Sequence, residues 1–202
     1  NHKGFTFHTL AIMFLQMTTL GYGLLLPTFV QIVLKHPATD AGVVLLPGAI
    51  VGAVFAPIGG LILDRLGAKK PIVLGLCCSF IATFCFLFFF KNLTYQSCIL
   101  FYFIYSLGIG LIVGNTMTSA MSHLPKNLQA DGNATLQTLM QLSGGIGTSI
   151  TATILAFVQQ GTNLYDGTNR GALFALIFLM FNINIVILSQ HFAFKGGKKN
   201  EF

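Results

Sequence analysis

The chain has 202 residues, of which 54% are hydrophobic and only 8% are charged, and its mean hydropathy is +0.77. A soluble domain carries about 25% charged residues, so this composition excludes a soluble globular protein and indicates one surrounded by lipid. The formal net charge is +6, but the basic residues are spread over several loops, which argues against a nucleic-acid-binding surface.

Six windows without any charged residue divide the chain, and each is 20 to 34 residues long. A bilayer core of about 30 Å needs roughly 20 apolar residues of helix, so each window holds one transmembrane helix and none holds two. The strands of a membrane barrel would alternate in hydropathy, which these windows do not. We therefore expect an all-α integral membrane protein with six transmembrane helices, at approximately residues 7–33, 41–63, 72–90, 97–121, 133–158 and 171–192.

The first three predicted helices differ in character. The first carries a polar stripe near its middle, with Gln16 and Thr19 on one face and Tyr22 beside it. The third, by contrast, is almost entirely apolar, and we expect most of its surface to face lipid. The second has small residues at every fourth position, a pattern that lets two helix backbones approach closely in a membrane. These small residues are Gly48, Gly52, Ala56 and Gly60.

Polar stripes recur in the fourth and fifth predicted helices. An amide in hydrocarbon needs a hydrogen-bond partner, so each of these residues either bonds to a neighbouring helix or faces a water-filled cavity. Three neutral polar stripes on three helices favour one shared substrate cavity. We expect the following residues to line it: Gln16, Thr19, Tyr22, Asn115, Ser119, Gln137 and Gln141.

The basic residues of the loops predict the orientation of the chain. Loops on the cytoplasmic side of a membrane protein carry an excess of Lys and Arg. Eight basic residues fall on the side of the termini, and three fall on the other side: Lys35, Lys91 and Arg170. We therefore expect a multi-pass protein of the cell membrane with both termini in the cytoplasm.

The acidic residues and the candidate catalytic residues are placed unlike those of an enzyme. All five acids lie in loops or at predicted helix ends, so no predicted span offers a carboxylate for a coupling proton. The sequence has no intramembrane constellation of His, Asp or Glu for catalysis, and its four cysteines lack the spacing of a zinc site. His8 and His123 lie near the membrane interfaces, and we do not expect them to carry protons. We expect no enzymatic activity, no metal and no cofactor.

One loop has a recognisable motif. Residues 60–70 read Gly-Leu-Ile-Leu-Asp-Arg-Leu-Gly-Ala-Lys-Lys, which resembles the loop signature G-x-L-x-D-R-x-G-R-K of the major facilitator superfamily, with departures at Ile62 and Ala68. The motif lies between the second and third predicted helices, as it does in that superfamily. The residues that match it, and that we expect to form a gating loop, are Gly60, Asp64, Arg65, Gly67, Lys69 and Lys70.

Three further stretches resemble the fourteen-span drug:proton antiporter branch, the EmrB/QacA type. They are Leu26-Pro27 with Gln31, residues 41–48 with Ala41-Gly42 and Leu46-Pro47-Gly48, and residues 138–147 with Gln141-Leu142-Ser143-Gly144-Gly145. The resemblance implies that residues 1–202 form the C-terminal half of such a fold, a 3+3 inverted repeat of six helices. The N-terminal half would then be absent from this chain.

The same resemblance implies a function and partners. A transporter of this kind exports lipophilic or cationic drugs by alternating access, driven by the proton gradient, with its substrate between two six-helix halves. Asp64 would brace the end of a helix in the other half, and the protonatable acid would also lie there. The implied partners are the lipid bilayer, the N-terminal half and a small-molecule substrate. Two alternatives stay open: an exporter of one endogenous metabolite or lipid, and a membrane scaffold that transports nothing.

Overall fold

The computed structural model describes residues 3–54 and 67–197, with side chains up to residue 195, and these residues fold into helices. Two single turns of 3-10 helix, Phe90–Asn92 (η1) and Lys126–Leu128 (η2), precede α5 and α6. The α-helices are α1 (Lys3–Ile32), α2 (Ala38–Val43), α4 (Lys69–Phe88), α5 (Tyr95–Ser122), α6 (Gln129–Gln159) and α7 (Leu164–Gly197).

Five of these helices are long and apolar enough to cross a membrane: α1, α4, α5, α6 and α7. The expectation of an all-helical membrane protein is confirmed by these helices. The second predicted helix, at 41–63, is described only as far as residue 54, and the remainder lies outside the described residues. The two last helices begin earlier than expected, at Gln129 and Leu164, because an acidic residue in the first turn is favourable at a helix N-terminus and does not stop the helix.

The second predicted helix is interrupted near its start. Helix α2 ends at Val43, a turn follows at residues 44–45, and helical structure resumes from residue 46 to 54. Pro47 explains the break, because its ring clashes with the carbonyl group four residues earlier, at Val43, and it has no N–H to donate. The segment therefore differs from the single continuous helix that hydropathy predicted.

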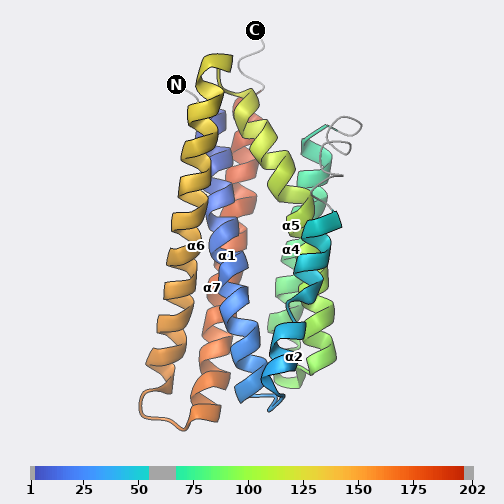
Figure 1. Ribbon diagram of the computed structural model, residues 1–202, viewed down its shortest axis with the longest axis vertical. Coiled ribbons are helices and arrows are strands. Elements are labelled where there is room, and N and C mark those ends of the chain that lie inside the picture. Colours follow the sequence, from blue (N-terminus) through green and yellow to red (C-terminus); the bar gives the residue numbers. More distant parts are fainter. Residues whose placement is uncertain (1–2, 55–66, 198–202) are drawn as a thin grey trace.

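Helix α1 is the centre of the bundle. Figure 1 shows α1 between α6 on one side and the pair of α4 and α5 on the other, with α7 running beside it. Its residues Tyr22, Leu25 and Phe29 share a hydrophobic core with Leu179 and Ile183 of α7. The ends of α1 and α7 that carry the chain termini lie at the same end of the molecule, where the rings of Phe7 and Phe192 stack with centroids 5.7 Å apart.

Glycines bring the helices into close contact at three crossings. A Cβ atom on Gly75 of α4 would lie 2.6 Å from the carbonyl oxygen of Gly108 on α5, and one on Gly147 of α6 would collide with the backbone of Met17 on α1. A Cβ atom on Gly48 would lie 3.0 Å from the hydroxyl oxygen of Tyr102 on α5. Gly52 has open space, while Ala56 and Gly60 of the predicted small-residue pattern lie outside the described residues.

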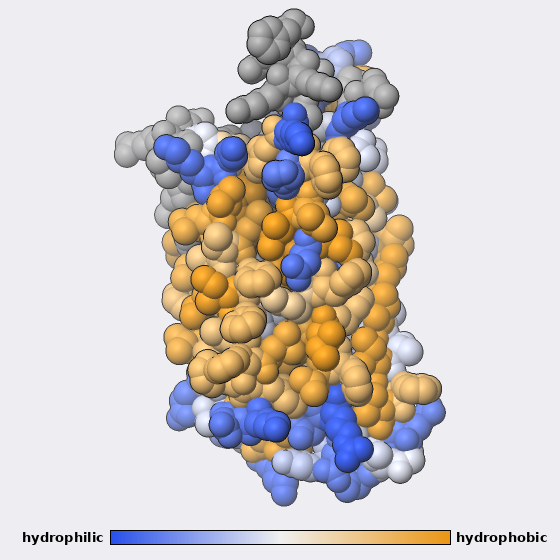
Figure 2. Space-filling model, turned by 180° about the vertical axis from the view of Figure 1, so that it is seen from behind, coloured by the Kyte–Doolittle hydropathy of each residue, from blue (hydrophilic) through white to orange (hydrophobic). Residues whose placement is uncertain are grey.

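The molecule has an apolar belt between two polar ends, and Figure 2 shows this belt from the side opposite to the view in Figure 1. Large apolar side chains of α4 and α7 are exposed in the isolated chain, among them Phe84, Phe88, Phe174 and Phe181. A belt of this kind is stable only against hydrocarbon. The inner face of α4 nevertheless buries Ser79 and Thr83 against the bundle.

The crossing of α1 and α6 gives a test of the fold with a built-in control. We expect Gly147→Ala to lower the free energy of unfolding by about 1–3 kcal/mol, because the added methyl group forces the two backbones apart. Gly145→Ala, two residues away and facing open space, should be neutral or slightly stabilising, since alanine favours helix. Thermal unfolding in detergent measures both. Equal effects at the two positions would contradict the close crossing.

Candidate functional site

Helix α6 exposes two different surfaces along its length. Its buried face, which includes Gly144, Gly147 and Thr151, packs against the bundle. Next to this face runs an exposed polar stripe with Gln137 and Gln141, and farther round the helix runs an exposed apolar stripe. The polar stripe consists of Gln137, Thr138, Gln141, Gly145 and Ser149, and the apolar stripe of Leu142, Ile146 and Phe157.

The polar stripe of α6 adjoins the exposed edge of α1. A Cβ atom on Gly144 would lie 2.5 Å from Leu20 Cδ1 and 3.4 Å from Gln16 Cγ. Gln16 is half-buried and Leu20 is 38% exposed, so this edge of α1 is open next to the stripe. Gln16 therefore lies next to Gly144, on the edge of α1 that adjoins the exposed stripe of Gln137 and Gln141.

Thr19 and Tyr22 lie deeper, in a cluster of tyrosines between α1, α4 and α5. Tyr22 is fully buried, and its hydroxyl donates a hydrogen bond of 2.9 Å to Thr83 Oγ1. The hydroxyl groups of Thr19 and Tyr105 lie 3.0 Å apart, and the rings of Tyr22 and Tyr105 have centroids 4.7 Å apart. In this arrangement the two predicted cavity residues join α1 to its neighbours through satisfied hydrogen bonds.

Asn115 and Ser119 occupy the buried side of α5. Asn115 is 1% exposed, its Nδ2 donates to the Leu111 carbonyl, and its Oδ1 has no hydrogen-bond partner among the described residues. Ser119 Oγ lies 3.0 Å from Nε2 of His8, which is fully buried on α1. Polar residues of this helix therefore face different ways, because Asn115 is buried while Thr118, three residues later, is exposed.

A buried polar cluster that the sequence analysis did not identify surrounds His8. Its ring lies 5.4 Å from the ring of His123, and Gln190 of α7 donates a hydrogen bond of 3.1 Å to Thr116 of α5. The spacing of Asn182, Ser189 and Gln190 on the last apolar window would have shown that α7 has a polar inner face.

One known protein family matches most of the chain. The family described as the Major Facilitator Superfamily matches residues 2–148. The chain belongs to the major facilitator superfamily. The match agrees with the long apolar helices, since the superfamily consists of membrane transporters and not of enzymes.

Individual relatives in this superfamily include named resistance proteins. The chain is 30% identical over 167 residues to the lincomycin resistance protein LmrB of Listeria innocua. This aligned stretch covers 83% of the chain and 35% of LmrB. It is 35% identical over 130 residues to the uncharacterized MFS-type transporter YhcA of Bacillus subtilis, covering 64% of this chain and 24% of YhcA. The quinolone resistance protein NorB of Staphylococcus aureus is 26% identical over 164 residues, 80% of this chain and 34% of NorB. The chain thus spans about a quarter to a third of the curated relatives it matches.

The superfamily loop motif is described only in part. Gly60, Asp64 and Arg65 lie outside the described residues, whereas Gly67 has a φ of +68° that a residue with a side chain adopts only with strain. Lys69 and Lys70 begin α4, and the Lys69 ammonium lies 5.9 Å from the centre of the Phe194 ring on α7. The described part of the motif therefore turns the chain into α4 and places Lys69 beside α7.

The acids of the described residues lie at helix ends. Asp40 is in the short helix α2 and pairs with His36, with Nδ1 and Oδ2 2.7 Å apart. Asp131 and Asp166 are in the first turns of α6 and α7. Within the described ranges, therefore, no carboxylate lies in the apolar part of a long helix that could cross the membrane.

The tyrosine cluster predicts an energetic coupling between α1 and α4. We expect Tyr22→Phe and Thr83→Val to be non-additive, with a coupling of about 0.6 kcal/mol, which is typical of a hydrogen bond between membrane helices. Thermal unfolding of the two single variants and the double variant measures this coupling. Tyr95→Phe combined with Thr83→Val is the control and should be additive, since Tyr95 stacks on His36 instead. Additivity in both pairs would show that the Tyr22 hydroxyl does not hold α1 to α4.

Proposed function

We propose that this chain is the C-terminal six-helix half of a cell-membrane exporter of lipophilic or cationic compounds. Two relatives carry names that refer to resistance to lincomycin and to quinolones, and the chain matches about a third of the length of each. A six-helix half of a longer transporter fits this coverage. The assignment to the fourteen-span EmrB/QacA branch rests on the Leu26-Pro27, residue 41–48 and residue 138–147 stretches.

The observation that carries this proposal is the exposed row of neutral polar groups on α6. Gln137 and Gln141 lie on the outside of the isolated chain, next to Gln16 of α1. An amide that faces lipid would lose its hydrogen bonds to water without replacement. The row is stable if it faces a water-filled passage, and the second half of the transporter would close that passage from the other side.

The chemistry of this surface suits varied ligands. Amides, hydroxyl groups and small residues carry no fixed charge, so they neither repel a cation nor require an anion. Binding then depends on apolar area and on a few hydrogen bonds, which many lipophilic compounds can supply. Thr19, Tyr22 and Ser119 would support the wall from behind, through the hydrogen bonds that fix α1 against α4 and α5. Asn115 would do so by its buried position alone, since its hydrogen bond stays within α5.

Transport by this half would require the other half. Alternating access moves two bodies against each other around one central site, and in this superfamily each body is built from two inverted three-helix repeats. The exporter would be driven by protons, and the acid that binds them would lie in the N-terminal half, since the described helices offer none within their apolar parts. Asp64 and Arg65 of the loop motif would meet a helix end of that half and release it as the two halves rock.

The orientation follows from the loops. Eight basic residues on the side of the termini, against three on the other side, would place both termini and the gating loop in the cytoplasm. A cysteine introduced at Ala68, in a background without native cysteines, should react with a membrane-impermeant reagent only after the cells are opened. Reaction from outside intact cells would reverse the assignment.

A second function uses the same surface. An exporter of one endogenous metabolite or lipid would also need neutral polar groups on α1 and α6, but it would discriminate sharply among compounds. A scaffold that transports nothing would need no such row. Substrate range separates these three functions.

The test is substitution of the exposed amides in the complete transporter. Gln137→Ala and Gln141→Ala should each change resistance or efflux for several unrelated drugs by different factors, roughly 3- to 10-fold, because each removes one hydrogen bond of about 1 kcal/mol. The protein level in the membrane should not change. Ile146→Ala, on the apolar stripe of the same helix, is the matched control and should leave the substrate range unaltered.

Three other results would count against the drug exporter. A uniform loss for all compounds, together with a lower protein level, would show that the amides serve packing. Loss confined to one cellular metabolite would favour the exporter of an endogenous compound. Unchanged transport of every compound tested would remove the amides from the passage.

A further inference from the structure

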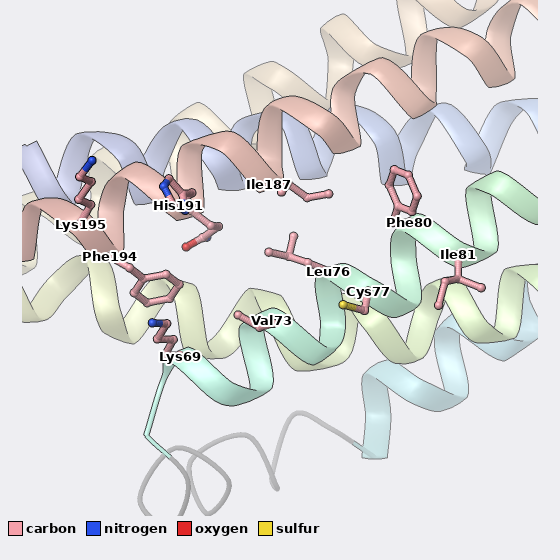
Figure 3. A pocket seen from close by; sticks show the side chains of 11 residues that line it. Lys69, Val73, Leu76, Cys77, Phe80, Ile81, Ile187, His191, Phe194 and Lys195 are labelled. Atoms are coloured by element: carbon pink, nitrogen blue, oxygen red, sulfur yellow. The ribbon is translucent and has the colours of Figure 1, made fainter.

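A groove with a volume of about 590 Å³ runs between α4 and α7 on the outer side of the bundle. Leu76 and Ile187 face it from opposite helices, and Figure 3 shows them reaching into the space between α4 and α7. Val73 and Ile81 extend the apolar wall along α4 and are 45% and 53% exposed. The described residues that line the groove belong to α4 and α7, and none belongs to the polar stripe of α6.

The two ends of the groove differ in charge. Lys69, His191 and Lys195 gather at the end nearest the termini, while Phe80 and Ile81 line the other end. None of the described residues that line the groove is acidic. Gln190 also lines it, but this side chain is 1% exposed and its Nε2 donates to Thr116 Oγ1 inside the bundle. The groove therefore offers a basic end joined to an apolar channel.

The length of the groove matches one leaflet of a bilayer. From Lys69 to Ile81 the rise along α4 is about 18 Å, and half of the hydrocarbon core is about 15 Å. The basic end lies where α4 and α7 leave the apolar belt, at the depth of lipid headgroups. An amphipathic molecule with an anionic head and long apolar chains fits this arrangement, whereas a soluble anion would leave the apolar channel empty.

We propose that the groove between α4 and α7 is a binding site for an anionic phospholipid of the leaflet on the side of the termini. Its phosphate lies between Lys69 and Lys195, with His191 beside it, and one acyl chain lies along Val73, Leu76 and Ile187. Basic sites between transmembrane helices select anionic headgroups in this way. The bound lipid joins α4 to α7, next to the Lys69 of the gating loop.

The test compares two lipids with identical acyl chains, phosphatidylglycerol and phosphatidylcholine, on the purified full chain in detergent. Native mass spectrometry should show tighter binding of phosphatidylglycerol, and this lipid should raise the melting temperature by roughly 3 °C more than phosphatidylcholine does. In the double variant Lys69→Gln/Lys195→Gln, phosphatidylglycerol should bind roughly 25-fold more weakly, since each lysine near an anionic surface contributes about a factor of five.

Control variants separate this site from general charge attraction. Lys3→Gln/Lys126→Gln removes the same charge from the same side of the membrane, but neither residue lines the groove. This variant should keep the preference for phosphatidylglycerol. Val73→Trp fills the channel and should weaken both lipids alike. Glycerol 3-phosphate, which has the headgroup charge without chains, should not compete.

Four results would overturn the proposal. Equal binding of the two lipids to the unaltered chain would remove the anionic preference. An equal loss in both lysine double variants would assign the attraction to overall charge. Competition by glycerol 3-phosphate would make the occupant a soluble phosphate compound. A dimer that Val73→Trp dissociates, without a change in lipid binding, would show that a second copy of the chain covers the groove.

Discussion

A polar group inside a bilayer needs a hydrogen-bond partner, and this constraint separates two kinds of polar residue in the chain. Thr83 accepts from Tyr22 and Ser119 lies within hydrogen-bond distance of His8, so these groups are satisfied inside the bundle. Gln137 and Gln141, by contrast, are exposed on α6 and do not lie inside the bundle. The difference between buried pairs and exposed amides distinguishes the packing surfaces of the chain from the surface that we propose faces water.

Close helix packing determines which polar residues are buried and which stay exposed. Gly147 lets α6 approach the backbone of α1 at Met17, and Gly75 and Gly108 bring α4 and α5 together in the same way. With α1 held on both sides, the open edge of this helix is limited to the strip that contains Gln16 and Leu20. The proposed passage is therefore positioned by contacts between small residues, while the hydrogen bonds of the tyrosine cluster add specificity behind it.

Much of the fold could be predicted from the sequence, because charge and hydropathy determine which segments stay in lipid. The number and length of the apolar windows gave the long helices, and the superfamily motif agreed with the family that residues 2–148 match. The break before Pro47 was missed because hydropathy does not register a missing N–H. The early starts of α6 and α7 were missed because the windows were bounded at charges, although Asp131 and Asp166 are favourable in a first helical turn.

The individual site residues were harder to place than the helices. Gln16, Thr19 and Tyr22 follow one another at helical spacing, yet Tyr22 is fully buried and Gln16 is only half-buried. Sequence spacing shows which residues share a helix face, but not which neighbour that face meets. Buried groups such as His8 and Gln190 depend on contacts between residues more than 70 positions apart, and no local pattern predicts those contacts.

On this proposal, one side of α6 faces water and the other faces lipid. Single cysteines along this helix in the complete transporter, in a background without native cysteines, test it directly. A water-soluble, charged thiol reagent should modify cysteines at Gln137, Gln141 and Ser149 much faster than cysteines at Leu142, Ile146 and Phe157, and substrate should slow the first group only. Equal reactivity of the two groups, or reaction confined to the apolar stripe, would contradict the account.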